Sequence, residues 1–211
     1  MADFDVVHQT GTYQVRACSV STMDNNAYLV TCRSSGRQAL VDAADDPDTL
    51  DRLVAAGTGA LDLVVTTHQH WDHHRALAAG RERHSVRTAA GAADADALPV
   101  TPDVRLTHGD VLTVGDLLLE VLALRGHTPG SVALALRAPD APTLLFTGDS
   151  LFPGGPGKTW SSQDFTQLMD DLQTRVFDVF PDDTVVLPGH GAGTTLGAER
   201  PHLAEWRERG W

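Results

Sequence analysis

Short apolar runs along the chain predict many buried strands, with helical patterns between some of them. The strands are predicted over residues 28–32, 38–44, 61–67, 110–114, 116–124, 131–138, 143–149 and 184–191. The helices are predicted at 47–56, 74–83, 91–98, 161–177 and 198–211. Ser161 and Asp164 can form a capping pair at the start of one helix, and apolar residues follow them at helical spacing. Strands outnumber helices, which predicts sheets covered by helices.

The chain has 211 residues, and we expect residues 1–211 to form one domain with no separate C-terminal substrate domain. It contains no apolar run long enough to span a membrane, and its first residues lack the apolar segment of a signal peptide. With only Cys18 and Cys32, a cytoplasmic setting with free thiols is expected. The net charge of −12 argues against binding to nucleic acid, which depends on basic patches. Trp206 and Trp211 are expected to be exposed, so a homodimer stays open beside a monomer.

Four histidines and an aspartate directly follow the predicted strand at 61–67, in the stretch "HQHWDHH". His68 and His70 can share one side of an extended segment, and Asp72 and His73 in the next turn can face a second metal ion. Three later strands also end in a glycine-rich turn with a candidate ligand, namely His127, Asp149 and His190. Glycine lets the backbone turn sharply and approach a metal ion closely. Together these seven residues predict a metal site at the ends of four strands.

Other polar residues near this pattern have ordinary interpretations. Histidines outside the strand-then-glycine context are predicted to lie at the surface or to bond within the core, and these are His8, His74, His84, His108 and His202. His74 is adjacent to the cluster and is interpreted as a residue supporting the ligands or starting a helix. Asp42 could support a ligand histidine, but an exposed turn is the favoured interpretation. Trp71 either lines the mouth of the site or packs against the fold.

On these residues the chain resembles the metallo-β-lactamase superfamily, from roughly residue 10 to residue 200. The resemblance implies an α/β fold, a four-layer αββα sandwich with two metal ions at one edge. It assigns His68, His70 and His127 to the first metal, Asp72, His73 and His190 to the second, and Asp149 to both. The best-known secreted β-lactamases of the superfamily carry a cysteine at the bridging position. Aspartate there resembles the glyoxalase II and lactonase branches instead.

The stretch "GDSLFPGGPGKTW" strengthens the resemblance to glyoxalase II, the hydroxyacylglutathione hydrolase. A similar segment of that family carries a lysine that binds the glutathione part of the substrate, which assigns substrate binding to Lys158 and Trp160. Lys158 is the single lysine of the chain, and an ordinary surface lysine is the alternative. The chain lacks the family's helical C-terminal domain and the Glu-Tyr that follows its last ligand. It therefore resembles the short bacterial glyoxalase II-like hydrolases, and the thiol carrier need not be glutathione.

The predicted function is metal-dependent hydrolysis of the thioester of a hydroxyacyl low-molecular-weight thiol. Two divalent metal ions, zinc in the first place with iron or manganese as alternatives, would hold a bridging hydroxide that attacks the thioester carbonyl. Asp72 would act as a ligand or would orient that nucleophile. Alternatives are an iron persulfide dioxygenase that uses His68, His127 and Asp149 around one metal, and a lactonase or other ester hydrolase with the two-metal site.

Overall fold

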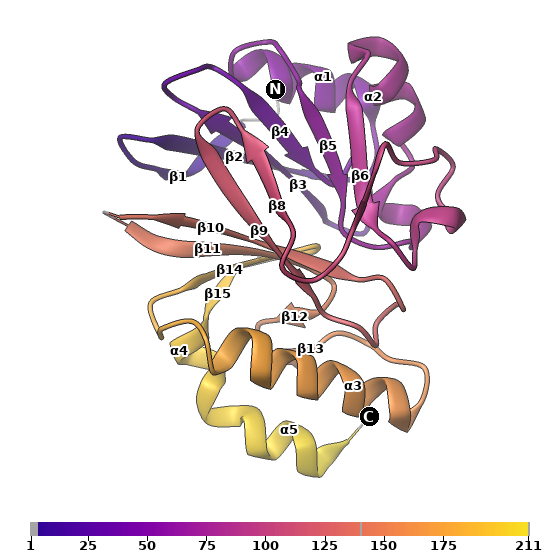
Figure 1. Cartoon of the computed structure of the whole chain (residues 1–211), viewed down its shortest axis with the longest axis vertical. Coiled ribbons are helices and arrows are strands. Elements are labelled where there is room, and N and C mark those ends of the chain that lie inside the picture. The colour runs from indigo at the N-terminus through magenta and orange to yellow at the C-terminus, as the bar shows by residue number, and fades with distance from the viewer. Residues whose placement is uncertain (1–3, 140, 211) are drawn as a thin grey trace.

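The computed structural model describes residues 4–139 and 141–210, which form two packed sheets with helices on both outer faces (Figure 1). The first sheet has the order β1-β2-β3-β4-β5-β6-β7. Its strands are β1 (Asp5–Gln9), β2 (Tyr13–Val20), β3 (Asn25–Cys32), β4 (Gln38–Val41), β5 (Leu63–Thr66), β6 (Arg87–Gly91) and β7 (Val104–Leu106). The strands from β4 to β7 run parallel to one another. Their carboxyl ends therefore lie along the same edge of this sheet.

The second sheet has the order β15-β14-β11-β10-β9-β8. Its strands are β8 (Val111–Val114), β9 (Leu117–Ala123), β10 (Val132–Ala138), β11 (Ala141–Gly148), β14 (Val185–Pro188) and β15 (Thr194–Thr195). A small hairpin of β12 (Leu151–Phe152) and β13 (Gly155–Pro156) follows β11. Because β11 and β14 are parallel neighbours, their carboxyl ends also meet at one edge.

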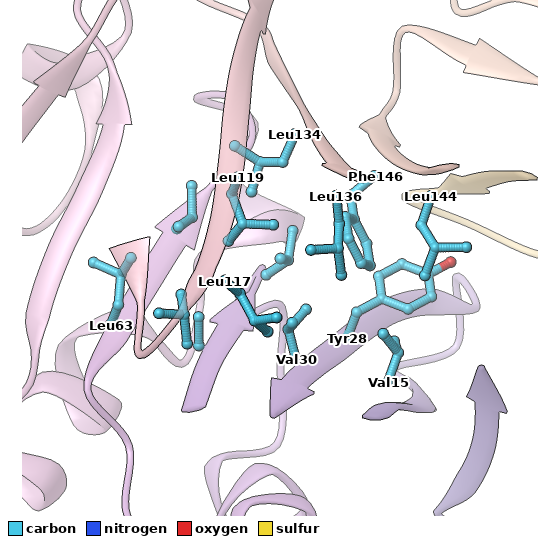
Figure 2. Packing of buried hydrophobic residues seen from close by; sticks show 14 of the residues in the cluster. Val15, Tyr28, Val30, Leu63, Leu117, Leu119, Leu134, Leu136, Leu144 and Phe146 are labelled. Atoms are coloured by element: carbon cyan, nitrogen blue, oxygen red, sulfur yellow. The ribbon is translucent and has the colours of Figure 1, made fainter. Parts of the chain in front are cut away.

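The main core lies between the two sheets and is built by strand alternation (Figure 2). In β9, Leu117, Leu119 and Val121 point into the space between the sheets, where residues of β10 and Phe146 of β11 meet them. The ring of Tyr28 from the first sheet packs edge-on against Phe146, with 5.4 Å between the ring centroids. Each such fully buried large apolar side chain contributes about 1.5–3 kcal/mol to the free energy of unfolding.

The outer faces of both sheets are covered by helices. On the first sheet lie α1 (Pro47–Ala56) and α2 (Leu77–His84), and on the second lie α3 (Ser162–Leu172), α4 (Leu196–Glu199) and α5 (Leu203–Arg209). The molecule therefore has the expected αββα layers. No helix within residues 4–139 and 141–210 is long and apolar enough to cross a lipid bilayer.

Several predicted elements differ from the structure. The strands β1 and β2 were not predicted, although Tyr13, Val15 and Ala17 of β2 alternate with polar residues as in a strand with one buried face. The helix predicted at 91–98 is only a 3-10 turn, Ala95–Ala97. The closing helix predicted at 198–211 is divided, with a 3-10 turn at Arg200–His202 between α4 and α5, where Pro201 cannot donate a backbone hydrogen bond.

The prediction that Trp206 is exposed is wrong. Its side chain is 1% exposed and packs against Phe177 on the outer face of the second sheet, with 6.2 Å between the ring centroids. Trp206 lies on α5 and helps to attach this helix to the sheet. It is therefore not available for a dimer contact, and Trp211 lies outside the described residues.

Candidate metal centre

Loops at the ends of strands from both sheets bring histidines and aspartates together at one edge of the sandwich. The turn after β5 carries His68, His70, Asp72 and His73. The second sheet contributes a side chain after each of β9, β11 and β14, namely His127, Asp149 and His190. The donor atoms form three overlapping groups, within each of which all atoms lie within 4.8 Å of one another. All seven predicted ligand residues belong to at least one of these groups.

The first group contains His68, His70 and His127. Nδ1 of His70 lies 2.9 Å from Nε2 of His127, and the ring centroid of His68 lies 4.9 Å and 4.8 Å from those of His70 and His127. Nδ1 of His127 donates to the backbone carbonyl of Lys158 at 2.6 Å, which leaves the lone pair of Nε2 facing the group. Three imidazole nitrogens thus converge on one point.

The tautomer of His68 is fixed by a chain of hydrogen bonds that begins at Asp42. The hydroxyl of Thr67 donates to Oδ2 of Asp42 at 2.8 Å, so it can only accept from Nδ1 of His68, 3.0 Å away. Nε2 of His68 then carries a lone pair. This atom is buried and has no hydrogen-bond partner among the described residues.

The second group contains Asp72, His73 and His190. Nε2 of His73 lies 3.1 Å from Nε2 of His190, which in turn lies 3.3 Å from Oδ2 of Asp72. Both rings are oriented from behind, because Nδ1 of His73 donates to Asp42 at 2.9 Å and Nδ1 of His190 donates to the carbonyl of Met23 at 2.8 Å. As in the first group, the backing partners leave the Nε2 atoms facing inward.

Asp149 lies between the two groups. Its Oδ2 is 3.7 Å from Nε2 of His127 and 3.5 Å from Nε2 of His190, and its Oδ1 is 3.4 Å from Nε2 of His73. The preceding residue, Gly148, has a φ of +50°, and a Cβ there would meet the hydroxyl of Thr67 at 2.6 Å. Glycine is therefore required for the turn that directs Asp149 toward the histidines.

The two groups differ in their electrostatics. Burial lowers the pKa of His68, His70 and His127, so these three rings are neutral at neutral pH. Each ring then has a nitrogen lone pair that can bind a metal ion. Burial alone would also lower the pKa of His73, but hydrogen bonds with Asp149 and Asp42 raise it to about 10.

The carboxylates of the centre stay ionised. Burial would raise the pKa of Asp149, but hydrogen bonds from His190 and His73 outweigh it and hold that pKa far below its usual range. The pKa of Asp72 is lowered for similar reasons, because the amide of Asn25 and the charge of His73 outweigh its burial. The protonated ring of His73 thus balances part of the negative charge of these carboxylates.

The donor set fits divalent metal ions. Imidazole nitrogens and carboxylate oxygens are the ligands that zinc and iron prefer, and the hydrogen bonds behind the rings are typical of ligand histidines. Nε2 of His68 is buried without a hydrogen-bond partner among the described residues. Buried polar atoms are rarely left unpaired, so the position of this atom, facing the group, fits a metal ligand.

The predicted substrate residues lie at the rim of this centre. The indole of Trp160 is 64% exposed, its ring centroid is 6.2 Å from that of His70, and its Nε1 donates to the carbonyl of His127 at 3.3 Å. Nζ of Lys158 lies 4.6 Å above the Trp160 ring. Trp71 is also exposed, with the guanidinium of Arg75 3.6 Å from its ring centroid, so its side chain is not packed into the core.

The favoured interpretation of Asp42 as an exposed turn residue is wrong. Its side chain is buried and accepts hydrogen bonds from His73 and from both the backbone and the hydroxyl of Thr67. The supporting role, which the sequence analysis left open as the alternative, is the one observed, because β4 lies beside β5. Asn25 was missed altogether, although it is buried at the start of β3 and its amide donates to Oδ2 of Asp72 at 3.0 Å. His74 supports the loop, with its Nε2 3.0 Å from the carbonyl of Gln69.

Comparisons with known proteins agree with this geometry. A hydroxyacylglutathione hydrolase of Ruegeria pomeroyi is 37% identical to the chain over 167 residues, which are 79% of the chain but 62% of that relative. ETHE1 from Myxococcus xanthus has a crystal structure that superposes with a TM-score of 0.77 at 30% identity, covering 92% of the chain and 84% of ETHE1. TTHA1623, solved in a di-iron-bound form, superposes with a TM-score of 0.69 at 30% identity, covering 87% and 96%.

The chain thus spans less than two thirds of the hydroxyacylglutathione hydrolase to which it is similar. The family model of the metallo-beta-lactamase superfamily matches residues 21–190, a range that includes every strand-end histidine and aspartate described above. The chain belongs to the metallo-beta-lactamase superfamily.

Proposed function

We propose that the protein is a metal-dependent hydrolase that cleaves the thioester of a hydroxyacyl low-molecular-weight thiol. The observation that carries the proposal is the position of Asp149 between two groups of histidines, all within reach of shared metal ions. The similarity to the hydroxyacylglutathione hydrolase of Ruegeria pomeroyi supports the reaction class and the thioester substrate.

We further propose that two divalent ions bind here, with zinc as the physiological metal and iron or manganese as alternatives. His68, His70 and His127 would hold one ion, Asp72, His73 and His190 the other, and Asp149 both. The ions would supply a water of lowered pKa and a Lewis acid for the carbonyl oxygen. Iron as an alternative is supported by the similarity to TTHA1623, which was solved with two iron ions.

The side chains of the chain itself would bind and orient the substrate. The indole of Trp160 packs edge-on against the ring of His70, and its hydrogen bond to the carbonyl of His127 holds it at the rim of the metal centre. Lys158 forms no ion pair among the described residues, so its ammonium group is free to bind a carboxylate of the thiol carrier. Asp72 stays ionised beside His190, where its carboxylate can accept a proton from the attacking water or orient it.

The test is hydrolysis of hydroxyacyl thioesters by protein reconstituted with zinc. His70→Ala and Asp149→Ala should each abolish turnover and lower the bound metal, while the fold is retained. His108→Ala is a suitable control, because His108 is exposed and outside the three groups, and it should behave as wild type. Full turnover in both of the first two variants would contradict the proposal.

An iron persulfide dioxygenase is the second candidate, and it would use His68, His127 and Asp149 around a single ion. The observation that favours it is the proximity of the three side chains: Oδ2 of Asp149 lies 3.7 Å from Nε2 of His127, and the ring centroids of His68 and His127 are 4.8 Å apart. The dioxygenase alternative assigns no function to the second group, which consists of Asp72, His73 and His190. Metal analysis combined with oxygen uptake on a persulfide separates the two candidates, and a panel of lactones separates thioesterase from lactonase. A cytoplasmic location and a monomeric or homodimeric state stay predictions.

A further inference from the structure

Asp94 is a fully buried carboxylate that joins the two loops carrying the histidines of the first group. It follows β6, outside the strand-end pattern of the ligands. Its Oδ2 accepts from the backbone N–H of Gln69 at 2.9 Å and from the hydroxyl of Thr128 at 2.5 Å. Its Oδ1 accepts from the backbone N–H of Gly130 at 2.7 Å. Gln69 lies between His68 and His70, and Thr128 directly follows His127.

The contact is close and leaves little freedom. A Cβ added to Gly130 would lie 2.4 Å from the backbone nitrogen of Asp94 and 2.7 Å from its Cγ, so the two segments touch through their backbones. The hydroxyl of Thr128 also lies 2.6 Å from that of Ser131, which fixes its direction. Asp94 therefore helps to set the positions of the His68–His70 segment and of His127 relative to each other, together with the backbone hydrogen bond from Val132 to Thr67.

The charge of Asp94 has no cationic side-chain partner. Within residues 4–139 and 141–210, no lysine, arginine or histidine forms an ion pair with it, in contrast to Asp171, which is also buried but binds Arg125 and Arg175. A buried charge without a counter-charge is costly. A divalent ion bound by His68, His70 and His127 would supply positive charge at the end of the two loops that Asp94 joins.

We infer that Asp94 is a positioning residue for the first metal site, which aligns His70 with His127 and attracts the cation electrostatically. It touches neither the ion nor the substrate, and it acts through the two loops. The inference rests on the proposed use of His68, His70 and His127 as metal ligands, but it does not depend on which substrate is hydrolysed.

The test is the titration of metal-free protein with Zn²⁺. Binding is monitored by calorimetry and by the imidazole NMR resonances of His70 and His127. Asp94→Asn keeps the size of the side chain but places an NH₂ group against one of the three donors. We expect affinity at the first site to fall about 10- to 100-fold, the usual range for residues that support metal ligands. The amides of Gln69 and Gly130 should also exchange faster in the metal-free variant.

Two further variants keep the test decisive if Asp94→Asn folds poorly. Thr128→Val removes one donor to Asp94 and should weaken the same site by less, whereas Thr128→Ser keeps the hydroxyl and should restore wild-type affinity. Asp103→Asn is a control, because Asp103 accepts from the backbone N–H of Thr88 on the same strand β6 but lies away from the histidines. It should alter only thermal stability.

A purely structural role would lower the melting temperature of Asp94→Asn and Thr128→Val and leave their zinc affinity at 20 °C unchanged, which would overturn the inference. Because the readout is metal binding, the result is separate from the proposed reaction. A wild-type protein that binds two ions but hydrolyses no thioester would refute the reaction and leave the role of Asp94 standing.

Discussion

Gly189 offers a sharp test of the packing at the metal centre. This residue precedes His190 and joins both sheets through its backbone, since its N–H donates to the carbonyl of Gly148 and its carbonyl accepts from Asn26. A Cβ at this position would meet Oδ1 of Asp149 at 2.3 Å and Cε1 of His73 at 2.6 Å. Its φ lies outside the left-handed region, so alanine would cause no backbone strain of its own. The effect of Gly189→Ala should therefore be steric and local.

The magnitude follows from these distances. Unstrained contacts lie near 3.5 Å, so both side chains must retreat by about 1 Å. Metal ligands tolerate displacements of only about 0.2 Å. The metal-free protein can relieve the clash by moving Asp149 and His73, but the metal-bound protein cannot. The overpacking cost of about 1–3 kcal/mol should thus appear as a 5- to 150-fold loss of metal affinity.

The assay is calorimetric titration of metal-free protein with Zn²⁺, with thermal unfolding measured in parallel. Gly191→Ala is the matched control in the same turn: a Cβ there meets no atom within 4 Å, although its φ of +63° favours glycine. That variant should lose about 1 kcal/mol of unfolding free energy through backbone strain and keep its zinc affinity. Wild-type zinc affinity in Gly189→Ala would refute the reasoning.

Three further predictions concern the groups around the metal ions. Asp42→Asn should lower the free energy of unfolding by about 1–3 kcal/mol, because its NH₂ group would face a buried donor of Thr67 or His73; an unchanged urea midpoint would contradict this. Since the pKa of His73 is raised to about 10, its ring carries a proton at pH 7.5 that a metal ion must displace, so zinc affinity should rise with pH. Calorimetry in buffers of different ionisation enthalpy measures the released protons, and zero release would exclude this charge state. Lys158→Met should raise KM for an anionic thiol carrier about 3- to 30-fold at unchanged kcat, with the exposed Arg87→Met as the control; a fall in kcat alone would argue against carrier binding.

The grouping of the seven side chains could be predicted from the sequence because each part of the pattern is local. A buried strand, a glycine and a polar residue occur together at His127, Asp149 and His190, and the fold brings these strand ends to one edge. The supporting residues could not be predicted in the same way. Asp42 was left open as a supporting residue, but its partner His73 lies 31 positions later and could not be identified, and the contact of Asp94 with Gly130, 36 positions later, leaves no local signal.

The same difference between local patterns and remote contacts decided which helices and buried residues could be predicted. The helix α1 was predicted with its correct bounds, because Pro47 marks its start and its apolar positions face the sheet. The burial of Trp206 was missed, because the short helix α5 is otherwise polar and its environment is created by α3 and the second sheet. Burial of a side chain in such a helix depends on partners that are remote in the sequence.

Neither half of the chain carries a complete set of the proposed donors for either ion. Residues before 100 supply His68 and His70 to one group and Asp72 and His73 to the other, while His127 and His190 arrive later during synthesis. If these residues bind metal as proposed, a nascent polypeptide gains its full affinity for metal only when the second half has been made and docked. The chain can be cut in the surface loop between β6 and β7 to give two fragments. When these fragments are mixed, zinc should promote their association.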